Sequence, residues 1–221
     1  PAGNFEKLRF ALHYGADAVY CAGKSFGLRA FAGNFSDEEL EEAVNYTHAR
    51  GKKIYVTLNM YPHNEQLEGL EEYLAFLNRI QPDAILVADP GVYSFTQAMD
   101  FTVPIHISTQ ATIVNWAGVK FWQEQNGIER VVLARELSLD EIETISQKTE
   151  TELEIFVHGA MCMSYSGRCL LSNYMTGRDA NQGECAQPCR WNYAIVEEKR
   201  PGVYYPIEQD QNGSYVFNSY D

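Results

Sequence analysis

The sequence lacks the apolar segments of exported and membrane-spanning proteins, and it has few of the basic residues typical of nucleic-acid-binding proteins. It contains no run of roughly 18 apolar residues, so we expect no membrane span, and no signal peptide is visible because no basic region followed by an apolar stretch occurs near its start. Basic residues are scarce, with 17 Lys and Arg against 30 Asp and Glu and a formal charge of −13. Most of the surface therefore repels a phosphate backbone, and a nucleic acid needs a local basic patch. We expect a cytoplasmic protein without membrane contact.

Cysteine is also rare over most of the chain. Only Cys21 precedes residue 158, whereas four cysteines fall within residues 162–189. An odd total of five, without an export signal, argues against a disulfide framework. The thiols are therefore available as ligands.

Several catalytic motifs are missing from the sequence. It has no H-E-x-x-H of a zinc protease, no G-x-S-x-G elbow, no G-x-x-x-x-G-K-[ST] loop and no Gly-rich dinucleotide loop. A thiol nucleophile with a histidine base could be assembled from Cys162 and His158, but no further feature supports this pairing. These absences weigh against hydrolase and nucleotide-binding functions.

Short β-branched runs alternate with amphipathic stretches along the first 158 residues. The expected strands are residues 17–21, 53–59, 84–89, 104–108, 130–135 and 153–159. Capping boxes at Ser36 with Glu39 and at Ser138 with Glu141 predict helix starts between them. A first helix over residues 4–15 predicts a further strand before it, and residues 192–198 or 215–219 are candidates for an eighth. The pattern favours an α/β fold, an incomplete parallel (β/α)8 TIM-type barrel, over an open doubly wound sheet.

The composition changes near the end of the sequence. Residues 199–214 carry Pro and Gly punctuation unlike the earlier repeat. We predict a barrel core over residues 1–190, ending in the cysteine-rich loop, and the start of a small β-rich extension over residues 191–221. Because the chain opens without Met and stops after a strand-like run, we expect it to be a fragment.

Polar residues follow the expected strands. Since barrel enzymes place reacting groups at the carboxyl ends of their strands, these residues are candidates for a substrate pocket. An alternative is that strand ends are polar because they meet solvent. The candidate substrate-binding residues are Arg29, Asn59, Asp89, Gln110 and Arg135.

Three residues near the last two strands are candidates for catalysis. Strand alternation sends one of Arg135 and Glu136 into the barrel mouth and the other away from it. Arg135 could clamp an anionic substrate, or form a structural salt bridge. His158 precedes the cysteine segment and could orient a metal ligand, or serve as a structural hydrogen-bond donor.

The cysteine segment has the spacing C-x6-C-x15-C-x3-C through Cys162, Cys169, Cys185 and Cys189. Zinc ribbons usually use two-residue gaps, whereas an iron–sulfur cluster accepts irregular spacing because each thiolate binds a different iron. The spacing favours an iron–sulfur cluster, with zinc and unligated structural thiols as alternatives. Cys21 is expected to pack as a small apolar side chain.

The segment at residues 154–193, "EIFVHGAMCMSYSGRCLLSNYMTGRDANQGECAQPCRWNY", resembles the signature of peptidase family U32, the collagenase-like proteins. Further stretches resemble the same family, and within it the subgroup of tRNA hydroxylation proteins. They are "PAGNFEKLRFALHYGADAVY", "NWAGVKFWQ", "VVLARELSLDEI" and "RPGVYYPIEQDQNGSYVFNS".

The resemblance implies a barrel core and a four-iron four-sulfur cluster on Cys162, Cys169, Cys185 and Cys189, although some relatives use a later cysteine in place of one of the last two. It further implies oxygen-independent hydroxylation of the tRNA wobble uridine to 5-hydroxyuridine, with prephenate as a required metabolite. The implied partners are tRNA and a second protein of the same family. A collagenase-like peptidase is the alternative function, and a non-catalytic tRNA-binding partner is the third.

Overall fold

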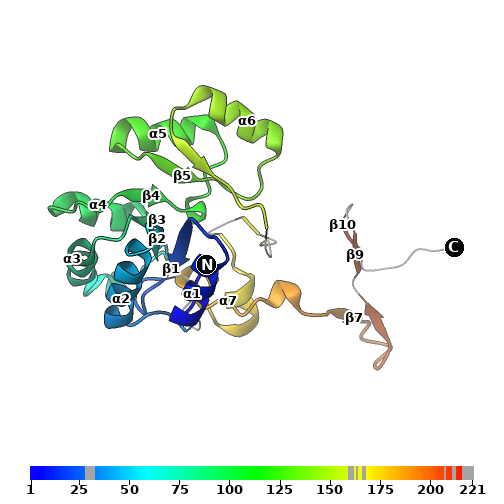
Figure 1. The fold of residues 1–221 in the computed structure, drawn as a ribbon. Helices are drawn as coiled ribbons and strands as arrows, with labels where there is room; N and C mark the ends of the chain where they lie inside the picture. The colour runs from blue at the N-terminus through cyan, green and yellow to red at the C-terminus, as the bar shows by residue number, and fades with distance from the viewer. Residues whose placement is uncertain are drawn as a thin grey trace. The chain divides into compact units, whose positions relative to one another are not determined.

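The first part of the chain is built on one parallel sheet. The computed structural model describes residues 1–27, 33–158, 162, 164–165, 168–206, 208–210 and 213–215. The strands of the sheet are β1 (Ala18–Cys21), β2 (Lys53–Leu58), β3 (Ala84–Val87), β4 (Ile105–Ile107), β5 (Arg130–Val132) and β6 (Glu152–Glu154). They lie in chain order, each parallel to the next. A doubly wound sheet would reverse its order at a switch point. The sheet curls instead (Figure 1), and the predicted incomplete α/β barrel is confirmed.

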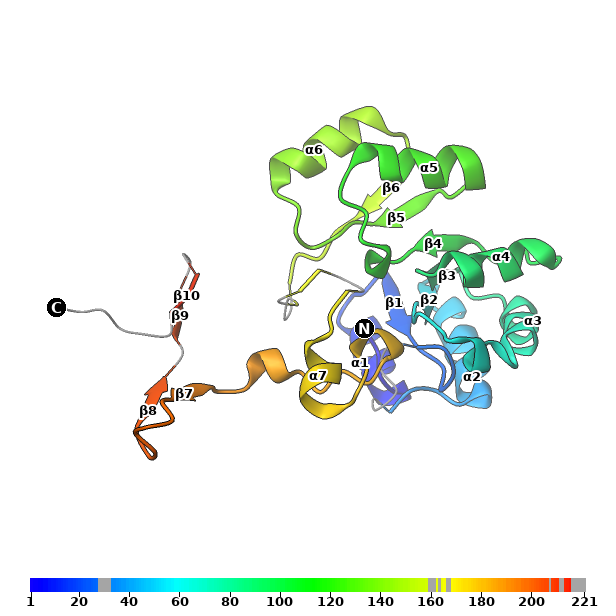
Figure 2. The same cartoon turned by 180° about the vertical axis from the view of Figure 1, so that it is seen from behind.

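Helices connect the strands, as the parallel order requires. Their bounds are α1 (Phe5–His13), α2 (Asp37–His48), η1 (Asn64–Leu67), α3 (Leu70–Ile80), α4 (Pro90–Ala98), η2 (Thr109–Ala111), α5 (Trp116–Asn126), α6 (Leu139–Lys148), α7 (Leu171–Thr176) and η3 (Ala180–Gln182). Both predicted capping boxes form: Ser36 N–H donates to Glu39 Oε2 at 2.8 Å, and Ser138 N–H donates to Glu141 Oε2 at 2.8 Å. Seen from behind in Figure 2, α5 and α6 lie side by side. Among the described residues, no helix has the length and apolarity that a membrane crossing needs.

The main core lies between the helices and the outer face of the sheet. On α3, Leu70, Leu74 and Leu77 are fully buried, at the spacing of one helix face. They pack in one cluster with buried strand residues such as Ile54. Cys21 is 4% exposed, as predicted for a packing residue, and burial raises the pKa of its thiol to about 12.

A charged network lies on the other face of the sheet. Arg130, the first residue of β5, donates to Glu152 Oε2 at 2.8 Å and to the Tyr55 hydroxyl at 3.0 Å. Its guanidinium lies 3.9 Å from Glu154, which also accepts a hydrogen bond from Tyr20. Side chains of opposite charge thereby tie β5 to β6, and the hydroxyls of Tyr20 and Tyr55 join β1 and β2 to this network.

His106 belongs to the same face and predicts a pH dependence of stability. It is 8% exposed, and burial, together with the nearby charges of Arg130 and Lys53, lowers its pKa to about 4. The unfolded chain therefore binds a proton at His106 near pH 6.5, whereas the folded chain binds it only near pH 4. The free energy of unfolding should fall between pH 6.5 and 4, by roughly 2 to 3 kcal/mol from this residue.

Urea titrations across this pH range test the expectation. His106→Leu should show a shallower loss of stability on acidification than the unmodified protein. The same pH dependence in both proteins would contradict the assignment to His106.

The second compact unit spans Gln187–Asp221. It contains η4 (Pro188–Arg190) and the antiparallel pairs β7 (Ala194–Val196) with β8 (Tyr204–Pro206) and β9 (Glu208–Asp210) with β10 (Gly213–Tyr215). The predicted β-rich extension is present. The prediction that residues 192–198 supply an eighth barrel strand is wrong, because β7 pairs only with β8 among the described residues. Residues 216–219 lie outside the described part. The structure divides the chain after Ala186, and a domain boundary at residue 190 stays a prediction.

Candidate functional site

Polar side chains from different strands meet at the carboxyl ends of the sheet. Asn59, after β2, donates from Nδ2 to Ser108 Oγ, after β4, at 3.1 Å. Asn59 Oδ1 is buried and has no hydrogen-bond partner among the described residues. A buried amide oxygen of this kind favours a donor from a ligand or water.

Tyr61 connects two further predicted residues. Its hydroxyl donates to the backbone oxygen of Gln110 at 2.5 Å. Burial raises the pKa of this hydroxyl, the carboxylate of Asp89 raises it further, and Arg168 lowers it. Asp89 also accepts from Val92 N–H at 2.9 Å, which caps α4. Asp89 therefore has a structural task as well as a place near the site. The sequence reasoning missed Tyr61, although it follows a strand end directly.

Arg135 and Glu136 lie in a turn after β5, so the strand alternation used to predict their directions does not extend to them. Arg135 is half-buried, lies 4.5 Å above the Phe156 ring, and donates from Nη1 to Cys162 Sγ at 3.7 Å. Glu136 is exposed. Arg135 therefore contacts the cysteine segment through Cys162.

The cysteine segment is anchored to the loop after β2. Tyr61 N–H donates to Asn181 O at 3.2 Å, and Asn181 Nδ2 donates to Cys169 O at 3.1 Å. Nearby, Gln66 Nε2 donates to Gln182 Oε1 at 3.2 Å. These bonds hold the backbone of Cys169 at the same strand ends that carry Asn59.

The cysteines differ in their exposure. All five are reduced thiols; Cys162, Cys185 and Cys189 are exposed and Cys169 is partly buried. Cys189 belongs to the second unit. No three His, Cys, Asp or Glu side chains within the described ranges converge on one metal position. Thiols are ligands that suit a soft metal or an iron–sulfur cluster.

The remaining predicted residues are distributed differently. His158 is exposed, and Arg29 lies outside the described residues. Of the arginines near the cysteines, Arg168 is exposed, whereas Arg178 donates from Nε to Glu184 O at 2.9 Å. Arg168 is therefore the better placed of these two to meet a phosphate.

The comparisons with known proteins agree on one family. A family model described as peptidase family U32 matches residues 3–221. The chain is 50% identical to tRNA hydroxylation protein P1 of Bacillus subtilis (strain 168), over 89% of this chain and 46% of that protein. It is 41% identical to tRNA hydroxylation protein P of Escherichia coli (strain K12), over 100% of this chain and 57% of that protein.

A solved structure supports the fold. The U32 peptidase Mk0906 is similar with a TM-score of 0.56 and 18% sequence identity, over 69% of this chain and 64% of that chain. At this identity the similarity bears on the fold alone. The chain spans about half the length of the curated relatives it matches.

Proposed function

The chain belongs to peptidase family U32, and from this premise we propose that the whole protein hydroxylates tRNA, converting the wobble uridine to 5-hydroxyuridine. The named relatives support the substrate class. The observation that carries the proposal is the anchoring of Cys169 by Asn181, which Tyr61 in turn ties to the strand ends. Soft ligands and a polar pocket thus lie next to each other, as redox chemistry on a polar substrate requires.

The proposal assigns each residue a task. Cys162, Cys169, Cys185 and Cys189 would hold a four-iron four-sulfur cluster, which supplies one-electron transfer when bound. Arg135 stabilises negative charge on the Cys162 sulfur and gives the site a cation for the carboxylates of prephenate, the proposed co-substrate. Asn59 and Gln110 offer amide groups for a base edge. tRNA would approach from the side of the exposed Arg168.

The peptidase alternative has weaker support. The sequence has no H-E-x-x-H or G-x-S-x-G motif. A non-catalytic tRNA-binding partner would not need the cysteines for modification.

In cells lacking 5-hydroxyuridine, expression of the whole protein should restore this nucleoside. Iron-independent cleavage of denatured collagen by pure protein, with no change in tRNA, would reverse the ranking.

Arg135→Gln is expected to lower the reduction potential of the proposed cluster by tens of millivolts. The lost guanidinium removes a hydrogen bond and a positive charge from the Cys162 sulfur, and both stabilise the more negative, reduced state. Spectroscopic redox titration of anaerobically purified protein measures the change. Glu136→Gln, at the neighbouring exposed position, is the control and should shift the potential little. Equal potentials for Arg135→Gln and the unmodified protein would contradict a role beside the cluster.

A further inference from the structure

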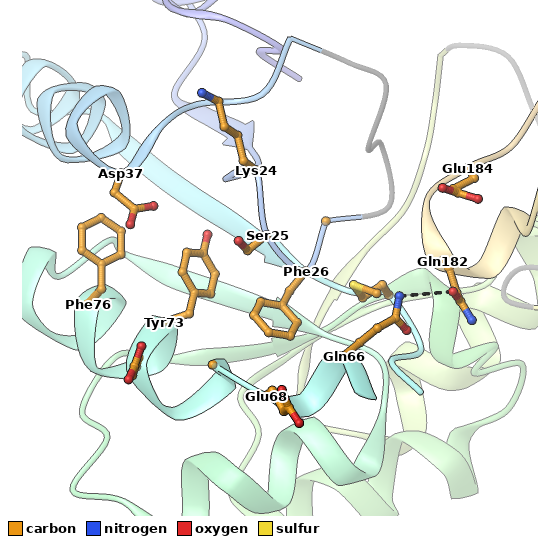
Figure 3. A pocket seen from close by; sticks show the side chains of 14 residues that line it. Lys24, Ser25, Phe26, Asp37, Gln66, Glu68, Tyr73, Phe76, Gln182 and Glu184 are labelled. Carbon is orange, nitrogen blue, oxygen red and sulfur yellow. Dashed lines mark hydrogen bonds between the residues drawn. The ribbon is translucent and has the colours of Figure 1, made fainter. Parts of the chain in front are cut away.

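A cavity of about 490 Å³ lies beside the loop that follows β1. Its walls come from that loop, the start of α2, the region from Met60 to α3, and the segment between Cys169 and Cys185. Figure 3 shows Phe26, Tyr73 and Gln66 facing this space. Of the predicted site residues that the structure describes, none lines it.

One wall is apolar, and the backbone of one of its residues is strained. The rings of Phe26 and Tyr73 stack with centroids 5.6 Å apart, and those of Tyr73 and Phe76 with centroids 6.0 Å apart. Phe26 has a φ of 58°, in the left-handed region that bulky residues rarely adopt. Strained backbone of this kind concentrates at ligand-binding positions.

The hydroxyl of Tyr73 accepts a hydrogen bond from the backbone of Gly23, and its own hydrogen has no acceptor among the described residues, although the side chain is only 7% exposed. It points toward Ser25 and Lys24 across the cavity (Figure 3). A Cβ on Gly23 would lie 2.2 Å from this oxygen, so glycine is needed there. A buried hydroxyl with incomplete hydrogen bonding is costly to the fold, and a ligand that hydrogen-bonds it would lower the cost.

The charge of the cavity selects the ligand. Among the described lining residues, four carry carboxylates and one, Lys24, carries an ammonium group. The carboxylates are those of Asp37, Glu68, Glu72 and Glu184. Phosphates and dicarboxylates would be repelled, whereas a cation would be attracted.

We propose that this cavity binds an organic cation: a primary amine or guanidine on an apolar stem. The stem packs on Phe26 and Phe76, the cationic head pairs with the carboxylates, and an N–H group donates to the Tyr73 hydroxyl. The source is either a free polyamine or a basic side chain of another protein. The proposal does not depend on tRNA hydroxylation.

An occupant would also touch the cysteine segment. Gln182, which lines the cavity, accepts from Gln66, and Glu184 directly precedes Cys185. Binding would therefore stabilise the conformation of the segment that carries Cys169 and Cys185.

Calorimetric titration of the whole purified protein at low salt tests the proposal. Spermidine and agmatine represent the free source, and acetyl-arginine amide represents a protein side chain; binding of any of these is the expected result. Succinate should not bind. Glu72→Gln should weaken cation binding roughly two- to fivefold, as for an exposed ion pair. Glu71→Gln, on the same turn of α3 but outside the cavity wall, should leave it unchanged.

Tyr73→Phe separates ligand binding from a structural role. It should weaken cation binding several-fold while leaving thermal stability unchanged or higher, because it removes a buried hydroxyl whose hydrogen has no acceptor among the described residues. The proposal is overturned if no amine or guanidine binds, if Glu71→Gln and Glu72→Gln act equally, or if Tyr73→Phe lowers stability without affecting binding. All these readouts are independent of tRNA modification.

Discussion

Replacing Cys162 or Cys169 with alanine should remove nearly all of the iron and labile sulfide from protein purified without oxygen. The unmodified whole protein should carry about four irons and four sulfides and be brown, as expected for a cluster held by four thiolates. Cys162 contacts Arg135, and the backbone of Cys169 is anchored through Asn181, so these two thiols are the best positioned of the four. Loss of one ligand exposes an iron of the cluster to solvent and oxygen.

Cys21→Ala is the matched control, since Cys21 is buried in the core and should leave the iron content unchanged. Colorimetric iron and sulfide assays with the visible absorption spectrum give the measurement. Stoichiometric zinc without iron in the unmodified protein would refute the iron–sulfur proposal. Full iron content in both Cys162→Ala and Cys169→Ala would refute the ligand assignment.

Arg130→Met should be the most destabilising of the charge substitutions, by roughly 2 to 3 kcal/mol in the free energy of unfolding. The side chain of Arg130 is 22% exposed and that of Glu154 is 30% exposed, so removing the cation leaves a half-buried carboxylate without its counter-charge. The Tyr55 hydroxyl also loses its donor. Because the network joins β5 and β6 to β2, its loss should weaken the strands that lead to Arg135 and the cysteine segment.

Arg79→Met is the control for this prediction. Arg79 pairs with Glu41 at 2.8 Å, but their side chains are 59% and 42% exposed. Solvent screens such a pair, so its removal should cost much less stability than the removal of Arg130. Urea unfolding of both variants at neutral pH gives the comparison. An equal loss of stability in the two variants would contradict the distinction between them.

The sequence predicted the local features of the fold well. Capping boxes at Ser36 and Ser138 and the buried face of α3 depend on residues a few positions apart, so their signals lie within short windows. The strands are shorter than predicted, because residues such as Arg135 follow the apolar run but no longer pair with a neighbouring strand. The eighth-strand candidate at residues 192–198 failed because an apolar run does not reveal which strand it pairs with.

Features made by distant residues were not predictable in the same way. Tyr20 and Glu154 are far apart in the chain, and only the curl of the sheet brings them together. The cavity around Tyr73 likewise needs the loop after β1, the start of α3 and residue Gln182 at once. By contrast, the side-by-side placement of Asn59 and Ser108 followed from the rule that parallel strands end at one edge.

The most direct test is mass spectrometry of tRNA nucleosides from cells that lack 5-hydroxyuridine and express the whole protein. The account predicts that the unmodified protein and Cys21→Ala restore 5-hydroxyuridine. Cys169→Ser, at equal protein abundance, should restore at least tenfold less. Full restoration by Cys169→Ser, or no 5-hydroxyuridine with the iron-loaded unmodified protein, would contradict it.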